Sequence, residues 1–206
     1  MIPGGQEEAE YDLSFKDLCE APRCEFTRGQ RVSARVTRVT VSPQEQVAQI
    51  VQHGAQESAS ALSRLLRRPV GVFGFALDDV RGVVADHGKV GVVMAFETTG
   101  GCPGHLAFIA DEASAARLVA SLTGADATDL NANALMALAE VSNIAASAFL
   151  NGAARVVGKT CLPSVPRVSH APIDQAVRGA LPDGAVARAS LQVDGTDTVT
   201  LAFVGV

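Results

Sequence analysis

Apolar residues recur at helical spacing in two long stretches of the chain. Ser42, Pro43 and Glu45 form an entry signal for the first stretch, because a hydroxyl can cap a helix, proline suits its first position and a glutamate can bond back to the cap. Small and apolar residues then follow on one face, and Pro69 ends the stretch. The second stretch runs from residue 130 to about residue 157 and ends at a glycine. This pattern predicts two long amphipathic helices.

Shorter apolar runs predict strands and further helical pieces. Asp111 can cap a helix that Gly124 ends. The segment between Pro172 and Pro182 is expected to be irregular or a short helix. β-branched or apolar runs separated by turn residues predict extended segments at residues 31–41, 70–75, 89–98, 105–110, 160–168, 186–193 and 198–204.

The order helix, strand, hairpin occurs twice, which predicts an internal repeat. Residues 105–110, HLAFIA, resemble residues 200–205, TLAFVG. One half alone could not bury its own sheet face. We therefore expect an α+β fold with a pseudo-two-fold repeat, in which two long helices cover one face of a mostly antiparallel sheet. The expected boundaries are a flexible N-terminal extension at residues 1–30 and a single domain at residues 31–206, with repeats at about 42–124 and 128–206.

Composition excludes several classes of function. Aromatic residues make up 4% of the chain and the formal charge is −5, so base stacking and phosphate-backbone binding are both disfavoured and no nucleic-acid partner is expected. No run approaches the roughly 18 apolar residues of a membrane span, and the acidic start does not resemble a secretory signal. The four cysteines form no CxxC pair, so we interpret them as free thiols in a cytoplasmic protein without a metal site: Cys19, Cys24, Cys102 and Cys161.

Glu140 and Asn143 lie one turn apart on the same side of the second long helix. In isolation such a pair is an ordinary solvated helix face. An acid and an amide displayed together can also form a small working surface. In the predicted repeat, Gln49 and Gln52 occupy the corresponding positions of the first helix, 91 residues earlier.

Glu140, Asn143 and Pro166 match the motif of a known family, and with their flanks, LAEVSNIAASAFLNGAA and LPSVPRV, they resemble the CheC/CheX/FliY chemotaxis phosphatases. The family pattern is Asp or Ser, three residues, Glu, two residues, Asn, twenty-two residues, Pro. The resemblance covers roughly residues 44–206. Having one intact motif, the chain is nearer to CheX than to two-site CheC.

The sequence departs from the family pattern at two places. Met136 stands at the Asp or Ser position, and as an apolar residue it is expected to pack. The first copy of the motif carries Gln49 and Gln52 in place of Glu and Asn, and Phe75 in place of the proline, so we expect that copy to be inactive.

The resemblance implies hydrolysis of the aspartyl phosphate of a CheY-type response regulator in chemotaxis or related two-component signalling. Asn143 would place the attacking water without bringing negative charge to the phosphoryl group, and Glu140 would pair with the lysine beside the phosphorylation site. Pro166 would shape the backbone at the strand entry. The chain would need no cofactor of its own, since magnesium would belong to the regulator. CheX forms dimers, so a homodimer is one option.

Two alternatives stay open at this point. A degenerate family member could dock a response regulator or a flagellar-switch protein without catalysis, which the methionine and the lost first motif favour. A thiol-based sensor using Cys19 and Cys24 is the third and weaker alternative.

Overall fold

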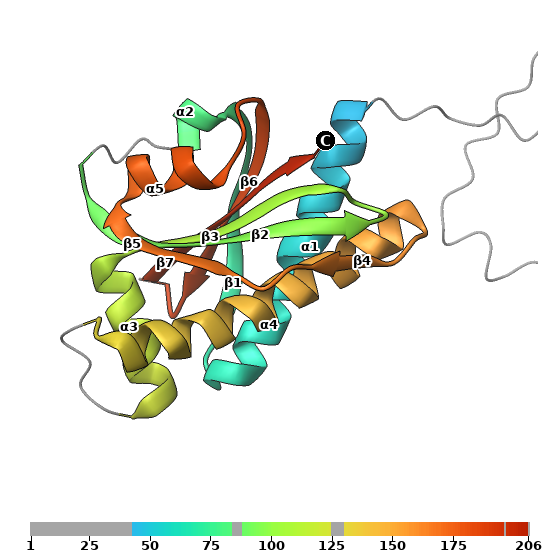
Figure 1. The fold of residues 1–206 in the computed structure, drawn as a ribbon. Coiled ribbons are helices and arrows are strands. Elements are labelled where there is room, and N and C mark those ends of the chain that lie inside the picture. Colours follow the sequence, from blue (N-terminus) through green and yellow to red (C-terminus); the bar gives the residue numbers. More distant parts are fainter. Residues whose placement is uncertain (1–42, 84–87, 125–129, 196, 206) are drawn as a thin grey trace, which may run out of the picture. The chain divides into compact units, whose positions relative to one another are not determined.

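The computed structural model describes residues 43–83, 88–124, 130–195 and 197–205 (Figure 1). The predicted extension at residues 1–30, the predicted strand at 31–41, the Ser42 cap, Cys19 and Cys24 lie outside the described residues. The domain boundaries that involve them therefore stay predictions.

The described elements form one antiparallel sheet with helices on both faces. In chain order the elements are α1 (Pro43–Leu66), β1 (Val70–Asp79), α2 (Val80–Val83), β2 (Val90–Gly100), β3 (Gly104–Asp111), α3 (Glu112–Thr123), α4 (Ala132–Val157), β4 (Cys161–Pro163), β5 (Arg167–Pro172), α5 (Ile173–Ala180), β6 (Ala185–Val193) and β7 (Asp197–Gly205). The sheet order is β1-β6-β7-β3-β2-β4, and β5 also pairs with β2. The predicted α+β architecture is therefore confirmed.

The two halves of the chain exchange strands within the one sheet. The first strand of one half, β1, pairs with β6 of the other half, and β4 and β5 pair with β2. The last strands of the two halves, β3 and β7, pair at the centre, where Ala107 lies opposite its repeat counterpart Ala202. The sheet therefore has the same strand order from either edge, and neither half has a complete sheet of its own.

The main hydrophobic core lies between the sheet and the long helices. In Figure 1, α1 and α4 cross on one side of the sheet, with α3 beside them, while α2 and α5 lie on the other side. Phe149 of α4 packs against Phe203 of β7 with ring centroids 5.9 Å apart. A smaller core on the opposite face includes Val93, Ile109 and Val177 of α5. The long helices thus cover one face as predicted, and α2, which the sequence did not predict, joins α5 on the other.

The crossing of α1 and α4 is close because both helices carry a glycine there. A Cβ atom on Gly152 would lie 2.6 Å from the backbone oxygen of His53, and one on Gly54 would lie 2.6 Å from the Phe149 ring. The Ser58 hydroxyl donates a buried hydrogen bond of 2.8 Å to the backbone oxygen of Ala145 across the same interface. The relative position of the two helices is therefore fixed by backbone contact.

Helix α4 is capped at both ends and is apolar along most of its length. The Asn131 side chain accepts a hydrogen bond from the Ala134 N–H, and Gly158 ends the helix in the left-handed conformation at φ 69°. Its mean hydropathy of 1.3 over 18 residues, together with its length, would allow it to cross a membrane. Its apolar face instead packs against α1 and the sheet, and core helices pass the same test.

Two extended segments differ from their predicted forms. The strand predicted at 70–75 continues to Asp79 because β6 pairs with it over that whole length. The segment predicted at 160–168 is broken at residues 164–166, between β4 and β5. Pro163 and Pro166 flank the pair Ser164 and Val165, and neither proline can donate a ladder hydrogen bond. Ser164 restores the contact: its N–H donates to Glu97 O at 2.8 Å, and its hydroxyl accepts from Glu97 N at 2.9 Å.

Candidate functional site

Glu140 and Asn143 are both exposed on α4, as their helical spacing predicts. Three residues apart, their Cβ atoms are about 5–6 Å from each other. Within the described ranges, no group forms a hydrogen bond or ion pair with either side chain. The acid and the amide are therefore available to a partner molecule.

The rest of α4 holds this pair in a fixed position. The neighbouring residues on the opposite side of the helix are buried, namely Leu138, Val141 and Ser142. The Ser142 hydroxyl donates a hydrogen bond of 2.9 Å to the backbone oxygen of Ala139. The packing on the far side of the helix sets the rotation of α4 about its axis. The exposed residues consequently form a rigid ridge, which the interaction with a partner would not have to order.

Pro166 lies in the break between β4 and β5 and is partly buried. The chain reverses after Gly158 and runs back beside α4 through β4 (Figure 1). A strand advances about 3.3 Å per residue and a helix 1.5 Å, so the segment around Pro166 returns to about the level of residues 143–147. The interval between Asn143 and Pro166 in the motif therefore spans the end of α4, strand β4 and the break that precedes β5.

The prediction that Met136 packs is wrong. Its side chain is 68% exposed. It lies four residues before Glu140, so it shares the exposed side of α4. The buried residues of α4 determine the rotation of the helix about its axis. This rotation places Met136 in solvent, although the side chain is apolar. Nearby Ile144, four residues after Glu140, is also exposed, at 40%.

The corresponding region of the first half has a different chemistry. Gln49 and Gln52 are exposed on α1 at the positions equivalent to Glu140 and Asn143. Phe75, at the position equivalent to Pro166, is 50% exposed. The side chains available there are two neutral amides and an aromatic ring, with no carboxylate among these three positions.

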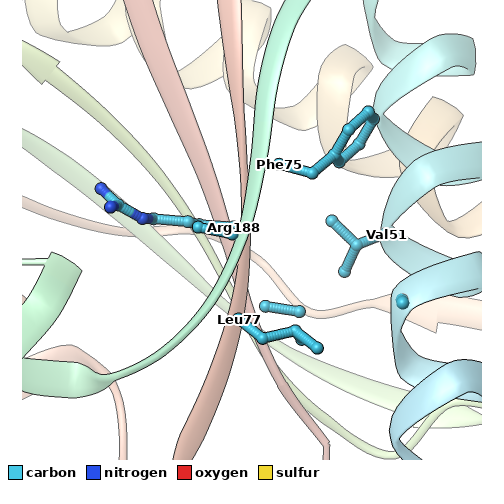
Figure 2. Close-up of a pocket in the computed structure, with 7 residues that line it drawn as sticks. Val51, Phe75, Leu77 and Arg188 are labelled. Atoms are coloured by element: carbon cyan, nitrogen blue, oxygen red, sulfur yellow. The ribbon is translucent and has the colours of Figure 1, made fainter.

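An apolar cavity of about 310 Å³ lies between α1 and β1 in this first half. Figure 2 shows Phe75 and Leu77 on the side of β1 that faces Val51 of α1, while Arg188 points away. Arg188 is ion-paired with Asp78 at 3.0 Å. The full lining is Ala48, Val51, Phe75, Ala76, Leu77, Ala187 and Arg188. The alternation of Phe75 and Leu77 was a sequence signal for an exposed apolar strand face, and the sequence-based prediction did not use it.

Cys102 and Cys161 are buried next to each other, at the β2–β3 turn and the start of β4. Burial, and secondarily the hydrogen bond and charge interaction with Cys161, raise the pKa of the Cys102 thiol to about 12. A thiol with such a pKa carries almost no thiolate at neutral pH, so it is a poor nucleophile. Among the described residues, no group of three or more His, Cys, Asp and Glu side chains could hold a metal ion.

The sheet of exchanged strands with its two long helices has the same fold as solved structures of CheC-like chemotaxis proteins. No family model matches the sequence, and no curated protein matches it. The likeness is structural, and at the identities given below it establishes the fold.

Three solved structures illustrate the likeness. FliY of Thermotoga maritima superposes with a TM-score of 0.63 at 20% identity, over 81% of this chain and 92% of that chain. CheX of Desulfovibrio desulfuricans gives a TM-score of 0.58 at 14% identity, over 76% and 99% of the two chains. A CheX–CheY complex of Borrelia burgdorferi with BeF3 and Mg²⁺ gives 0.57 at 12% identity, over 77% and 98%. The resemblance to the CheC/CheX/FliY group is thus confirmed at the level of fold.

Proposed function

We propose that this chain is a phosphatase that hydrolyses the aspartyl phosphate of a CheY-type response regulator in chemotaxis or related two-component signalling. The observation that carries the proposal is the exposed, unpartnered pair of Glu140 and Asn143 on a rigid helix. The fold supports it, because a CheX with this fold was solved in a complex with CheY, BeF3 and Mg²⁺.

The chemistry needs only a positioned water. An aspartyl phosphate is already reactive, so no covalent nucleophile is required from this chain. The amide oxygen of Asn143 accepts a hydrogen bond from a water and aligns it with the phosphorus. The water oxygen bonds to phosphorus, the bond from phosphorus to the aspartyl oxygen breaks, and inorganic phosphate and a free carboxylate leave. An uncharged amide suits this role because it does not repel the phosphoryl oxygens.

Glu140 has a docking role in this proposal. Its carboxylate would repel a phosphoryl group at close range, and its place one turn from Asn143 lets it pair with the lysine beside the regulator's phosphorylation site. The regulator supplies the magnesium ion, which neutralises charge on the phosphoryl oxygens. Catalysis is then completed only when the α4 ridge inserts into the regulator's site.

The decay of a phosphorylated regulator tests the proposal. With the wild-type chain present, the phosphate is expected to be lost faster than by the regulator's own hydrolysis. Asn143→Ala is expected to reduce that acceleration about 100-fold, because the water loses its orientation. Gln52→Ala, the equivalent truncation on α1, is the matched control and should leave the rate unchanged. No acceleration by the wild type, or an Asn143→Ala variant as fast as the wild type, would refute the proposal.

A non-catalytic docking module is the second candidate. The exposed Met136, where the family motif has Asp or Ser, favours it. This candidate predicts that the chain binds the phosphorylated regulator while the decay rate of the phosphate stays the same. Binding and decay measured on the same regulator preparation separate the two candidates.

Two further parts of the proposal follow from the substrate. The chain works in the cytoplasm, because its substrate is a cytoplasmic signalling protein. A homodimer stays a prediction, and sedimentation of the purified chain over a range of concentrations measures it.

A further inference from the structure

We propose that Met136 and Ile144, with Val165 beside them, form an apolar docking surface that selects the partner regulator. This inference rests on the proposed function and names the residues that give the same site its specificity. The occupant is the surface of a receiver domain around its phosphorylated aspartate.

Two exposed apolar residues of α4 lie on either side of Glu140. Met136, Glu140 and Ile144 follow one another at intervals of four residues, so the carboxylate lies between two apolar side chains on one row of the helix. At 100° per residue, these three and Asn143 occupy an arc of about 100°. Every approach of a partner to the acid and the amide therefore brings it against the methionine and the isoleucine.

A further exposed apolar residue follows the strand that returns beside the helix. Val165 is 84% exposed, in the break between β4 and β5. Ser164 fixes this break through its two hydrogen bonds to the Glu97 backbone, so the neighbouring valine is held outward. By the rise of strand and helix, this segment lies at about the level of Asn143 and Ile144. An exposed apolar side chain is therefore present on the segment that follows β4, the strand that contacts α4, as well as on α4 itself.

The chemistry of this surface fits a folded protein partner. Single exposed apolar residues are ordinary, but three around an unpartnered acid and amide form a patch with an apolar rim and a polar centre. Methionine is enriched in protein interfaces and adapts to the shape of its partner. A small phosphorylated metabolite would gain nothing from this rim, whereas a folded receiver domain presents both a phosphoryl group and apolar side chains. The methionine at the Asp or Ser position is then an anchor for docking.

Binding and turnover measured separately test this inference. The probe is a CheY receiver loaded with beryllofluoride and Mg²⁺, a stable mimic of the phosphorylated state, and its Kd is measured by calorimetry. The double variant Met136→Ser/Ile144→Ser is expected to weaken binding about 10-fold or more, and each single variant less. Leu65→Ser, at an exposed apolar residue of α1 outside this surface, is the matched control and should keep the wild-type Kd.

The outcomes separate this inference from the proposed function. Asn143→Ala should reduce phosphate decay while changing Kd less than about 3-fold, since truncation of a residue outside the binding hot spot costs little. Binding that depends on Met136 and Ile144 without faster decay would overturn the phosphatase and keep the docking surface. An unchanged Kd in the double variant overturns the docking surface and leaves the phosphatase standing. A Met136→Ser variant with faster maximal decay and unchanged Kd also overturns it, because the position would then act in catalysis.

Discussion

The two halves of this molecule have the same buried architecture and different exposed chemistry. Both halves place a long helix over the sheet, and the two helices meet at the Gly54–Gly152 contact. On the outer side, α4 presents an acid and an amide, whereas α1 presents two glutamines beside the apolar cavity of β1. A helix can thus keep its buried packing while its exposed side changes, because different residues form the two sides.

The edges of the sheet differ in the same way. The edge formed by β4 and β5 is interrupted and contains Pro163 and Pro172 as well as Arg167, which are features that discourage pairing with another strand. The edge formed by β1 runs for ten residues without a proline or a lysine. The half with the candidate chemistry is therefore protected at its edge, and the other half exposes an apolar one.

The largest effect on stability is expected at the shared helix contact. Gly152→Ala should destabilise the protein by about 1–3 kcal/mol, because the new methyl group meets the His53 backbone of α1, which cannot rotate away. Denaturant unfolding measures this free energy. Gly179→Ala in α5, where an added Cβ meets nothing within 4 Å, is the control and should be neutral or stabilising by about 0.5 kcal/mol. Equal effects of the two changes would show that the halves do not rely on this contact.

The next expected effect is a dependence of stability on pH, which arises at the contact between Cys102 and Cys161 of the two halves. The pKa of Cys102 is about 12 in the folded state and 9.0 is its ordinary value, so the folded protein holds a proton that the unfolded chain loses. Stability should therefore be intact below pH 9 and fall as the pH rises from 9 towards 12, by at most about 1.4 kcal/mol per pH unit for one proton. Denaturant midpoints at several pH values measure this slope. Cys102→Ala should remove its part of the slope, and an unchanged slope would exclude the thiol as its source.

A smaller effect is expected from the polar contact between the long helices. Ser58→Ala removes the buried hydrogen bond to Ala145 O and should cost about 1 kcal/mol, since the carbonyl loses its side-chain donor. Ser60→Ala, at an exposed position of the same helix, should change the unfolding free energy by less than about 0.5 kcal/mol. Thermal unfolding of the two variants measures both effects. If Ser58→Ala destabilises the protein no more than Ser60→Ala, the hydrogen bond does not stabilise the interface.

The smallest effect is expected from an exposed ion pair between the halves. Arg155 of α4 pairs with Glu57 of α1, and the arginine side chain is 69% exposed. A double-mutant cycle with alanine at both positions should give a coupling of about 0.5 kcal/mol or less, which added salt reduces further. A coupling well above 1 kcal/mol would mean that surface charge, as well as buried packing, holds the two helices together.

The sequence predicted most of the fold because its local signals agreed with the tertiary structure. Helical periodicity located both long helices, Gly158 marked the end of the second one, and the glycine-rich turns located the hairpins. The ridge could also be predicted from the sequence, because a spacing of three residues places Glu140 and Asn143 on the same side of a helix. The repeat also predicted that the two halves form a single domain, since one half alone cannot bury its own sheet face.

The remaining features depend on contacts between distant segments, which local patterns do not encode. The extension of β1 to Asp79 depends on β6, and the break at Ser164 depends on the backbone of Glu97. Met136 was assigned to the interior by its side-chain type, while the packing of its neighbours on α4 leaves it in solvent. At Met136 the apolar character of the residue therefore does not predict its burial, and this residue lies at the candidate site.

The exchange of strands also has a consequence for how the chain reaches its native state. Strand β1 must wait for β6, as Val70 lies opposite Val193, while the β2–β3 hairpin can close as soon as it leaves the ribosome. Such distant pairing slows folding, because a long loop has to close before the contact stabilises it. During synthesis, Phe75 and Leu77 therefore stay on an unpaired strand, where nascent chains are prone to aggregate. The period before β6 emerges is the one in which we expect this protein to depend most on chaperones.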